Sequence, residues 1–153
     1  MKQVMTSAWE KFEELIKAEM RKVYSETTID HAMNPRNLRG MEDADGFARV
    51  TGPCGDTMEI WLKVKNGTIA EANFLTDGCG TSIASGSMAT EMAKGKAVAQ
   101  AQRISQQGVL SALGGLPEES KHCALLAANT LKAAIRDYLA MKKEPWKKAY
   151  GKY

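Results

Sequence analysis

The fold is decided by the stretch from Thr57 to Thr76, TMEIWLKVKNGTIAEANFLT. In its first half every second side chain is apolar, which is the period of a strand with one buried face. The apolar positions are Met58, Ile60, Leu62 and Val64. Asn66-Gly67 predicts a hairpin turn, and the residues beyond it predict a second strand through Leu75.

The length of this turn determines the register of the hairpin. A strict two-residue turn would place Leu62 opposite Glu71 and put an acid on the apolar face. A three-residue or bulged turn puts Ala70, Ala72 and Phe74 on that face instead. We expect the second arrangement, because burial determines register.

The segments on either side complete the predicted domain. Residues 47–51 predict a third, antiparallel strand, and residues 82–94 predict a helix that stops at Gly95. Shorter helices are expected at 97–104 and 109–113, and Pro117 with two following acids predicts a long helix to about Lys143. Its expected buried side is Leu125, Leu126, Ala133, Ile135, Tyr138 and Leu139. Strands followed by helices, without βαβ alternation, predict an α+β fold.

Residues 1–23 predict an N-terminal helical extension. Its apolar residues recur at helical spacing and form one stripe. The stripe consists of Met5, Trp9, Phe12, Ile16, Met20 and Val23. We expect this helix to dock on the core; packing on another subunit or partner is the alternative. Residues 24–33 are expected either to continue this helix or to restart it after a break with Ser25 as N-cap, and the helix is expected to end before Pro35.

Composition bounds the class of protein. The chain has 153 residues, 44% hydrophobic and 25% charged, which is typical of one globular domain and excludes collagen-like or generally disordered chains. No apolar run approaches the roughly 18 residues of a membrane span, so we expect no membrane partner. The net charge of +3 is concentrated in the last dozen residues, which contain Lys142, Lys143, Lys147, Lys148 and Lys152. We expect the basic tail at 144–153 to be solvated rather than bound to nucleic acid. Acids interrupt the first twenty residues, unlike a targeting segment, so we expect a cytoplasmic protein.

The three cysteines lie at the ends of predicted elements and do not resemble a secreted disulfide framework. Glycines flank Cys54 and Cys79, which lets the backbone approach a bound atom closely. Cys79 and Cys123 lie near predicted helix N-termini, where we expect lowered thiol pKa values. Thiolates bind soft metals and attack sulfur.

Each candidate also has a purely structural interpretation. A lone cysteine is most often a small buried apolar residue, and Cys123 fits that description best. Taken alone, His122 is an exposed or capping histidine, His31 is structural and Asp56 is an ordinary turn residue. No CxxC motif occurs, so spacing alone leaves both the structural interpretation and a three-thiolate site open.

Several short motifs occur in order along the chain. They are Tyr24-Ser25-Glu26, Ile29-Asp30-His31, Asn34-Pro35-Arg36-Asn37, Cys54-Gly55-Asp56, Gly78-Cys79-Gly80 with Ile83-Ala84-Ser85, Gly95-Lys96, and His122-Cys123 with Leu126-Ala127. With these motifs the chain resembles the NifU/IscU family of iron–sulfur scaffold proteins. The resemblance implies an α+β domain at 24–143, with helices packed on one face of a three-stranded antiparallel sheet. It also implies a scaffold rather than an enzyme: a [2Fe–2S] cluster is assembled on it from iron and persulfide sulfur, then passed to apo-proteins.

The resemblance implies that Cys54, Cys79 and Cys123 are ligands, with His122 or Asp56 completing the site. Iron–sulfur clusters prefer thiolates, and a non-cysteine ligand makes one iron easier to release. Neighbouring helix residues point about 100° apart, so His122 and Cys123 both bind only where the helix start is irregular or shifts. Zinc, which competes for thiolates, is an expected occupant of the purified protein.

The resemblance also implies partners. A cysteine desulfurase would supply persulfide sulfur, with Cys123 as the acceptor, and apo iron–sulfur proteins would receive the cluster. A frataxin-like or ferredoxin partner and a homodimer are further expectations. Leu116-Pro117 is followed by Glu118 and Glu119, unlike the chaperone-recruiting loop of many family members, which argues against recruitment of a chaperone there.

The main alternative is a SufU-like zinc-dependent sulfurtransferase using the same three cysteines and Asp56. That branch usually has an insertion between its second and third cysteines and a basic residue at the position of His122, and this chain has neither. A structural zinc module built on the cysteines and His122 is the other binding alternative. A Cys–His hydrolase is disfavoured, because no oxyanion loop is recognisable.

Overall fold

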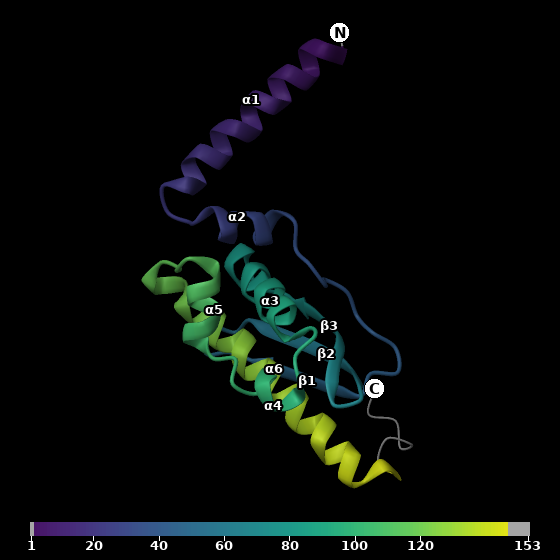
Figure 1. The fold of residues 1–153 in the computed structure, drawn as a ribbon. Coiled ribbons are helices and arrows are strands. Elements are labelled where there is room, and N and C mark those ends of the chain that lie inside the picture. Colours follow the sequence, from purple (N-terminus) through teal and green to yellow (C-terminus); the bar gives the residue numbers. More distant parts are fainter. Residues whose placement is uncertain (1, 147–153) are drawn as a thin grey trace.

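The computed structural model describes residues 2–146, so Lys147, Lys148 and Lys152 of the predicted basic tail lie outside the described residues. Its centre is a three-stranded antiparallel sheet in the order β1-β2-β3. The strands are β1 (Gly46–Thr51), β2 (Thr57–Lys65) and β3 (Thr68–Thr76). Two helices, α3 (Gly80–Ala93) and α6 (Lys121–Lys143), pack on one face of this sheet (Figure 1). The predicted α+β architecture is therefore confirmed.

Shorter elements complete the fold. They are α2 (Glu26–Met33), α4 (Val98–Ala101), α5 (Gln106–Leu113) and the 3-10 helix η1 (Glu118–Ser120). The core lies between the sheet and the helices, where Met58, Ile60, Leu62 and Phe74 are fully buried. Within residues 2–146, none of the helices is both long and apolar enough to span a bilayer.

The β2–β3 hairpin confirms the expected shift of register and corrects its detail. Leu62 pairs with Ala72, and Glu71 pairs with Lys63 on the other face. The turn itself has two residues, Asn66 and Gly67, both with left-handed φ angles. The shift arises within the strands instead, between the pairs Val64–Ile69 and Lys63–Glu71. Ala70 is consequently exposed, contrary to the prediction, and Ile69 takes the buried position.

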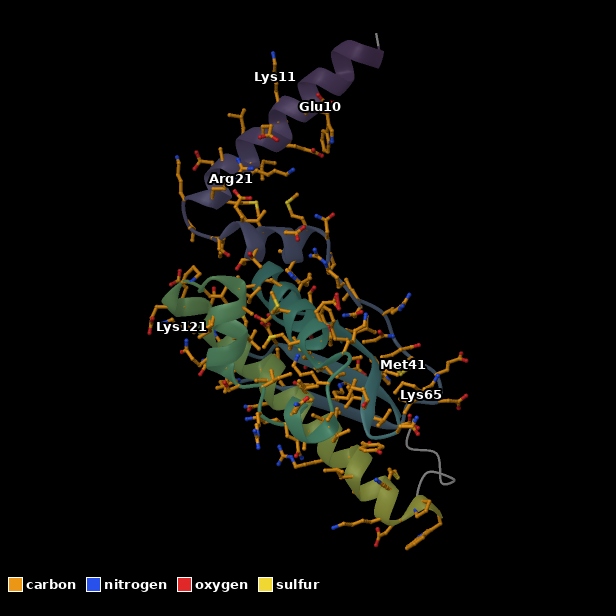
Figure 2. All side chains as sticks on the ribbon, in the orientation of Figure 1. Glu10, Lys11, Arg21, Met41, Lys65 and Lys121 are labelled. Carbon is orange, nitrogen blue, oxygen red and sulfur yellow. The ribbon has the colours of Figure 1, made fainter. Side chains whose placement is uncertain are left out.

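The N-terminal helix α1 (Lys2–Arg21) does not dock on the core, so that prediction is wrong. It extends away from the sheet and its covering helices, with Glu10 and Lys11 on the distant part (Figures 1 and 2). Trp9, Phe12 and Val23 remain more than half exposed; the side chain of Met5 lies outside the described residues. Periodicity predicts that one face of a helix is apolar but does not predict what covers that face. Packing of α1 on another subunit or partner remains a prediction.

The observed helix boundaries confirm some of the predicted helix starts and correct others. The hydroxyl of Ser25 accepts from the backbone N–H of Thr28, so Ser25 caps α2 as predicted. The long helix α6 starts at Lys121, after a 3-10 turn, rather than at Pro117. Leu125 is 40% exposed, contrary to the prediction, because the buried face of α6 runs through Ala124, Leu126 and Ala127.

Candidate metal and cluster site

Two loops meet at the end of the sheet where β2 begins and β3 ends. In the first loop, the N–H of Gly52 donates to the carbonyl of Asp56 at 2.8 Å. Gly55 adopts a left-handed φ of 88°, which favours glycine because that conformation is strained for other residues. A hydrogen bond of 2.7 Å from the N–H of Thr57 to Asp77 Oδ1 joins this loop to the segment that carries Cys79. The joined loops bring residues more than twenty positions apart to one end of the sheet.

Cys79 is the N-cap residue of α3 and is exposed. Its Sγ atom lies 3.1 Å from the hydroxyl of Thr81. This hydrogen bond, together with the backbone N–H groups of Ser82 and Thr81, outweighs partial burial and lowers the pKa of the Cys79 thiol. The pKa shift expected at this helix start is therefore confirmed for Cys79.

Cys123 lies in the first turn of α6, two residues after Lys121 (labelled in Figure 2), and is 1% exposed. Its Sγ atom is 3.4 Å from the hydroxyls of both Thr81 and Ser82. Burial raises the pKa of this thiol despite the two hydroxyls. The lowered pKa predicted from its position near a helix start is wrong, because desolvation of a thiolate there exceeds the effect of the helix end.

The thiol of Cys123 and two further ligand atoms lie close together. Within the described part of the chain, one ligand atom each from Asp56, His122 and Cys123 lie within 4.8 Å of one another. The Nε2 atom of His122 lies 3.6 Å from Sγ of Cys123. Carboxylate, imidazole and thiolate are all ligands of zinc, and thiolate with imidazole also suits iron. The donor set therefore fits a metal ion or a cluster.

The structure brings the five predicted site residues together only in part. Cys79 lies outside the close group of three, although Thr81 connects its sulfur with that of Cys123. Cys54 is exposed in the β1–β2 loop and also lies outside that group. Binding by all three cysteines therefore remains a prediction, and it requires the Cys54 side chain to turn inward.

Two hydroxyl residues of the site escaped the sequence analysis. Thr81 and Ser82 are both buried in the first turn of α3. Thr81 contacts both thiols, and Ser82 donates to Oδ2 of Asp56 at 3.1 Å. The available signal is their position directly after Cys79-Gly80, since side chains of a helix tilt toward its N-terminus and those of the first turn can reach a group bound there.

A small apolar groove opens beside Cys79. It has a volume of about 170 Å³. Its lining residues are Met20, Tyr24, Thr28, Ile29, Ala32, Cys79, Gly80, Thr81 and Ser120. The exposed thiol of Cys79 is therefore reached from a surface formed by the end of α1, the link to α2 and α2 itself.

His31 of α2 lies outside this site and is structural, as expected. Its side chain is 7% exposed, and Nδ1 lies 2.7 Å from the hydroxyl of Ser87 on α3. Burial, and then the charge of Arg36, lower the pKa of this imidazole. The neutral ring thus helps to hold α2 on α3.

Named proteins resemble this chain over most of its length. The iron-sulfur cluster assembly scaffold protein IscU 1 of Archaeoglobus fulgidus is 50% identical over 117 residues, which cover 76% of each chain. The scaffold protein IscU of Haemophilus influenzae is 44% identical over 122 residues, covering 76% of this chain and 96% of that protein.

Solved structures share the fold. A nitrogen-fixing NifU-like protein (N-terminal) from Brucella abortus superposes with a TM-score of 0.62 at 20% identity, covering 79% of this chain and 97% of that one. A putative iron-sulfur cluster assembly scaffold protein for the SUF system from Fervidobacterium islandicum gives a TM-score of 0.59 at 21% identity, covering 73% and 96%.

The family comparison agrees with the motifs. Residues 23–145 match the family described as NifU-like N terminal domain. That span contains the sheet, the helices that cover it and every residue of the candidate site. The chain therefore belongs to the NifU-like N terminal domain family.

Proposed function

We propose that this chain is a scaffold on which an iron–sulfur cluster is assembled and from which it is passed to apo-proteins. The observation that carries the proposal is the convergence of Asp56, His122 and Cys123 within 4.8 Å, beside the exposed thiol of Cys79. The relatives that are 44–50% identical are named scaffold proteins for the same assembly. The cluster is the cargo of this site rather than a permanent cofactor.

The finer proposal is a [2Fe–2S] cluster bound by Cys54, Cys79 and Cys123, with His122 or Asp56 as the fourth ligand. Thiolates hold both irons, and an oxygen or nitrogen ligand holds one of them less firmly than sulfur does. Three free cysteines and the mixed donor group at Cys123 support this arrangement. Zinc occupies the same donors when iron is absent.

Sulfur would arrive from a cysteine desulfurase. The thiolate of Cys123 attacks the outer sulfur of the donor's persulfide, the donor's S–S bond breaks, and the donor cysteine leaves as a thiolate. Cys123 then carries the persulfide. Because the Cys123 thiol is buried, the start of α6 must open for this transfer.

Further proposals concern partners, location and assembly. A ferredoxin or a frataxin-like protein is a further proposed partner. The proposed site of action is the cytoplasm, and a homodimer is proposed for the free state.

Anaerobic reconstitution with ferrous iron, cysteine and a cysteine desulfurase tests the function. We expect a visible [2Fe–2S] spectrum that disappears from this chain when an apo-ferredoxin is added and appears in the ferredoxin. A chain that binds zinc, stimulates the desulfurase and never acquires a cluster would instead be a zinc-dependent sulfur acceptor, and the scaffold proposal would be wrong.

A further inference from the structure

Ser82 occupies a distinctive place in the candidate site. Its side chain is fully buried in the first turn of α3. Its Oγ atom lies 3.1 Å from Oδ2 of Asp56 and 3.4 Å from Sγ of Cys123. One hydroxyl therefore contacts two of the three residues whose ligand atoms converge.

The carboxylate of Asp56 depends on this contact for its orientation. Asp56 lies in a loop whose backbone is held by the hydrogen bond from Gly52 to the Asp56 carbonyl. That bond constrains the main chain but leaves the side chain free to rotate. Within residues 2–146, no other side-chain hydrogen bond holds this carboxylate. Without the hydroxyl, the carboxylate would turn toward water.

The residues around Ser82 and Asp56 leave room for the hydrogen bond between them. Gly78 precedes Cys79, and a Cβ atom added there would lie 2.9 Å from Oδ2 of Asp56 and would overlap the side chain of Ser82. A glycine at position 78 therefore leaves the space that the Ser82–Asp56 hydrogen bond occupies. Thr81, the neighbouring hydroxyl, contacts the two thiols instead.

We propose that Ser82 is the positioning residue that holds the carboxylate of Asp56 beside Cys123 as a metal ligand. This inference rests on the proposed function, since it concerns the same site. A hydroxyl has one proton, which Ser82 donates to the carboxylate oxygen Oδ2, and this bond fixes the Asp56 carboxylate beside Cys123. Ligating carboxylates are commonly oriented by such hydrogen bonds, and removing an orienting partner lowers metal affinity by roughly 10- to 100-fold.

A double-mutant cycle with Zn2+ as the probe tests the assignment, with affinities measured by competition with a chelator. We expect S82A to lower Zn2+ affinity about tenfold when Asp56 is present. In a D56A background, S82A should change the affinity less than twofold, because the residue that Ser82 orients is already gone. Equal losses in both backgrounds, or no loss in the first, would overturn the proposal.

Two further variants separate positioning from folding. S85A is the matched control, because Ser85 is also a buried serine of α3 but its hydroxyl has no hydrogen-bond partner among residues 2–146. We expect S85A to bind Zn2+ like the parent chain. S82T keeps the hydroxyl on the same Cβ and should restore affinity and its dependence on Asp56; if S82T behaves like S82A, the hydroxyl is not the cause.

Cluster loading of the parent chain distinguishes the two proposals. If the parent chain never acquires an iron–sulfur cluster, the scaffold function fails, while the coupling of Ser82 to Asp56 is still measured with Zn2+. If the parent chain acquires a cluster but the cycle shows no coupling, only the role of Ser82 fails. Co2+ in place of Zn2+ adds a spectroscopic check, since loss of an oxygen ligand changes the visible absorption of the bound ion in S82A and D56A alike.

Discussion

The Nε2 atom of His122 lies 3.6 Å from the Sγ atom of Cys123, although the two residues are consecutive on α6. Consecutive residues of a regular helix point about 100° apart. At this position a 3-10 turn, η1, leads into α6, and both residues belong to its first turn. The two side chains therefore reach one site from an irregular helix start. Such a start is the condition expected from the sequence for binding by both residues.

Asp56 is expected to shorten the lifetime of a bound cluster. In D56A the weakly held carboxylate is gone and His122 is left as the proposed fourth ligand, so the cluster should be released several-fold more slowly. Decay of the visible absorbance after anaerobic reconstitution measures the lifetime. E42A is the control, because it removes an exposed acid between α2 and β1. A decay of D56A that is no slower than that of the parent chain contradicts the prediction.

Cys79 is expected to react faster than Cys123 with iodoacetamide in the metal-free protein. Cys79 is exposed and the pKa of its thiol is lowered, whereas Cys123 is buried and the pKa of its thiol is raised. A lowered pKa increases the thiolate fraction at neutral pH, so the rate at Cys79 should persist as the pH falls below 8. Peptide mass spectrometry assigns the modified residue at each time point.

Removing the hydroxyl of Thr81 tests whether the lowered pKa of Cys79 causes its faster reaction. It is the largest contribution to the lowered pKa of Cys79, so T81A should raise the pKa and slow alkylation of Cys79 about threefold at pH 7. T27A, an exposed threonine of α2, should leave the rate unchanged. Faster modification of Cys123 than of Cys79 in the parent chain would refute the assignment of the two thiols.

Gly86 permits the close packing of α3 on β3. A Cβ atom at this position would overlap the ring of Phe74, whose Cε2 would lie 2.5 Å away. We expect G86A to lower the free energy of unfolding by about 1–3 kcal/mol, despite the better helix propensity of alanine. Urea denaturation followed by circular dichroism measures the change.

Gly108 provides the matched control for that substitution. It also lies in a helix, but the nearest atoms to an added Cβ are 3.5 Å or more away. G108A is therefore expected to leave stability unchanged or to raise it by up to about 1 kcal/mol. Equal effects of G86A and G108A would show that close packing against Phe74 is not the cause.

His31 is expected to make stability depend on pH. Its pKa is lowered in the folded chain, so folding favours the neutral imidazole. The contribution is complete above the unfolded value of about 6.5 and is lost as the pH falls below it toward the folded pKa. The free energy of unfolding of the parent chain should therefore fall relative to that of H31Q between pH 7 and pH 5. A constant difference between the two chains across this range argues against the prediction.

The sequence alone determined the elements that depend on local pattern. Alternation through Met58, Ile60 and Leu62 predicted a half-buried strand, and Ser25 predicted a helix cap, because both signals arise from a few neighbouring residues. The ordered motifs around Cys54, Cys79 and His122 identified the family. Local pattern also placed a register shift near the turn, since Glu71 had to avoid the buried face.

Only the tertiary structure decided what depends on distant contacts. Burial raises the pKa of the Cys123 thiol, whereas its position near a helix start had predicted a lowered pKa. Ile69 is buried on the core face of β3, whereas the sequence had predicted Ala70 there. Most of the apolar stripe of α1 is exposed, and the sequence did not predict this because a periodic pattern specifies a face and not its partner. Ser82 joins Asp56 and Cys123 through space, and the sequence separates these three residues by at least twenty-six positions.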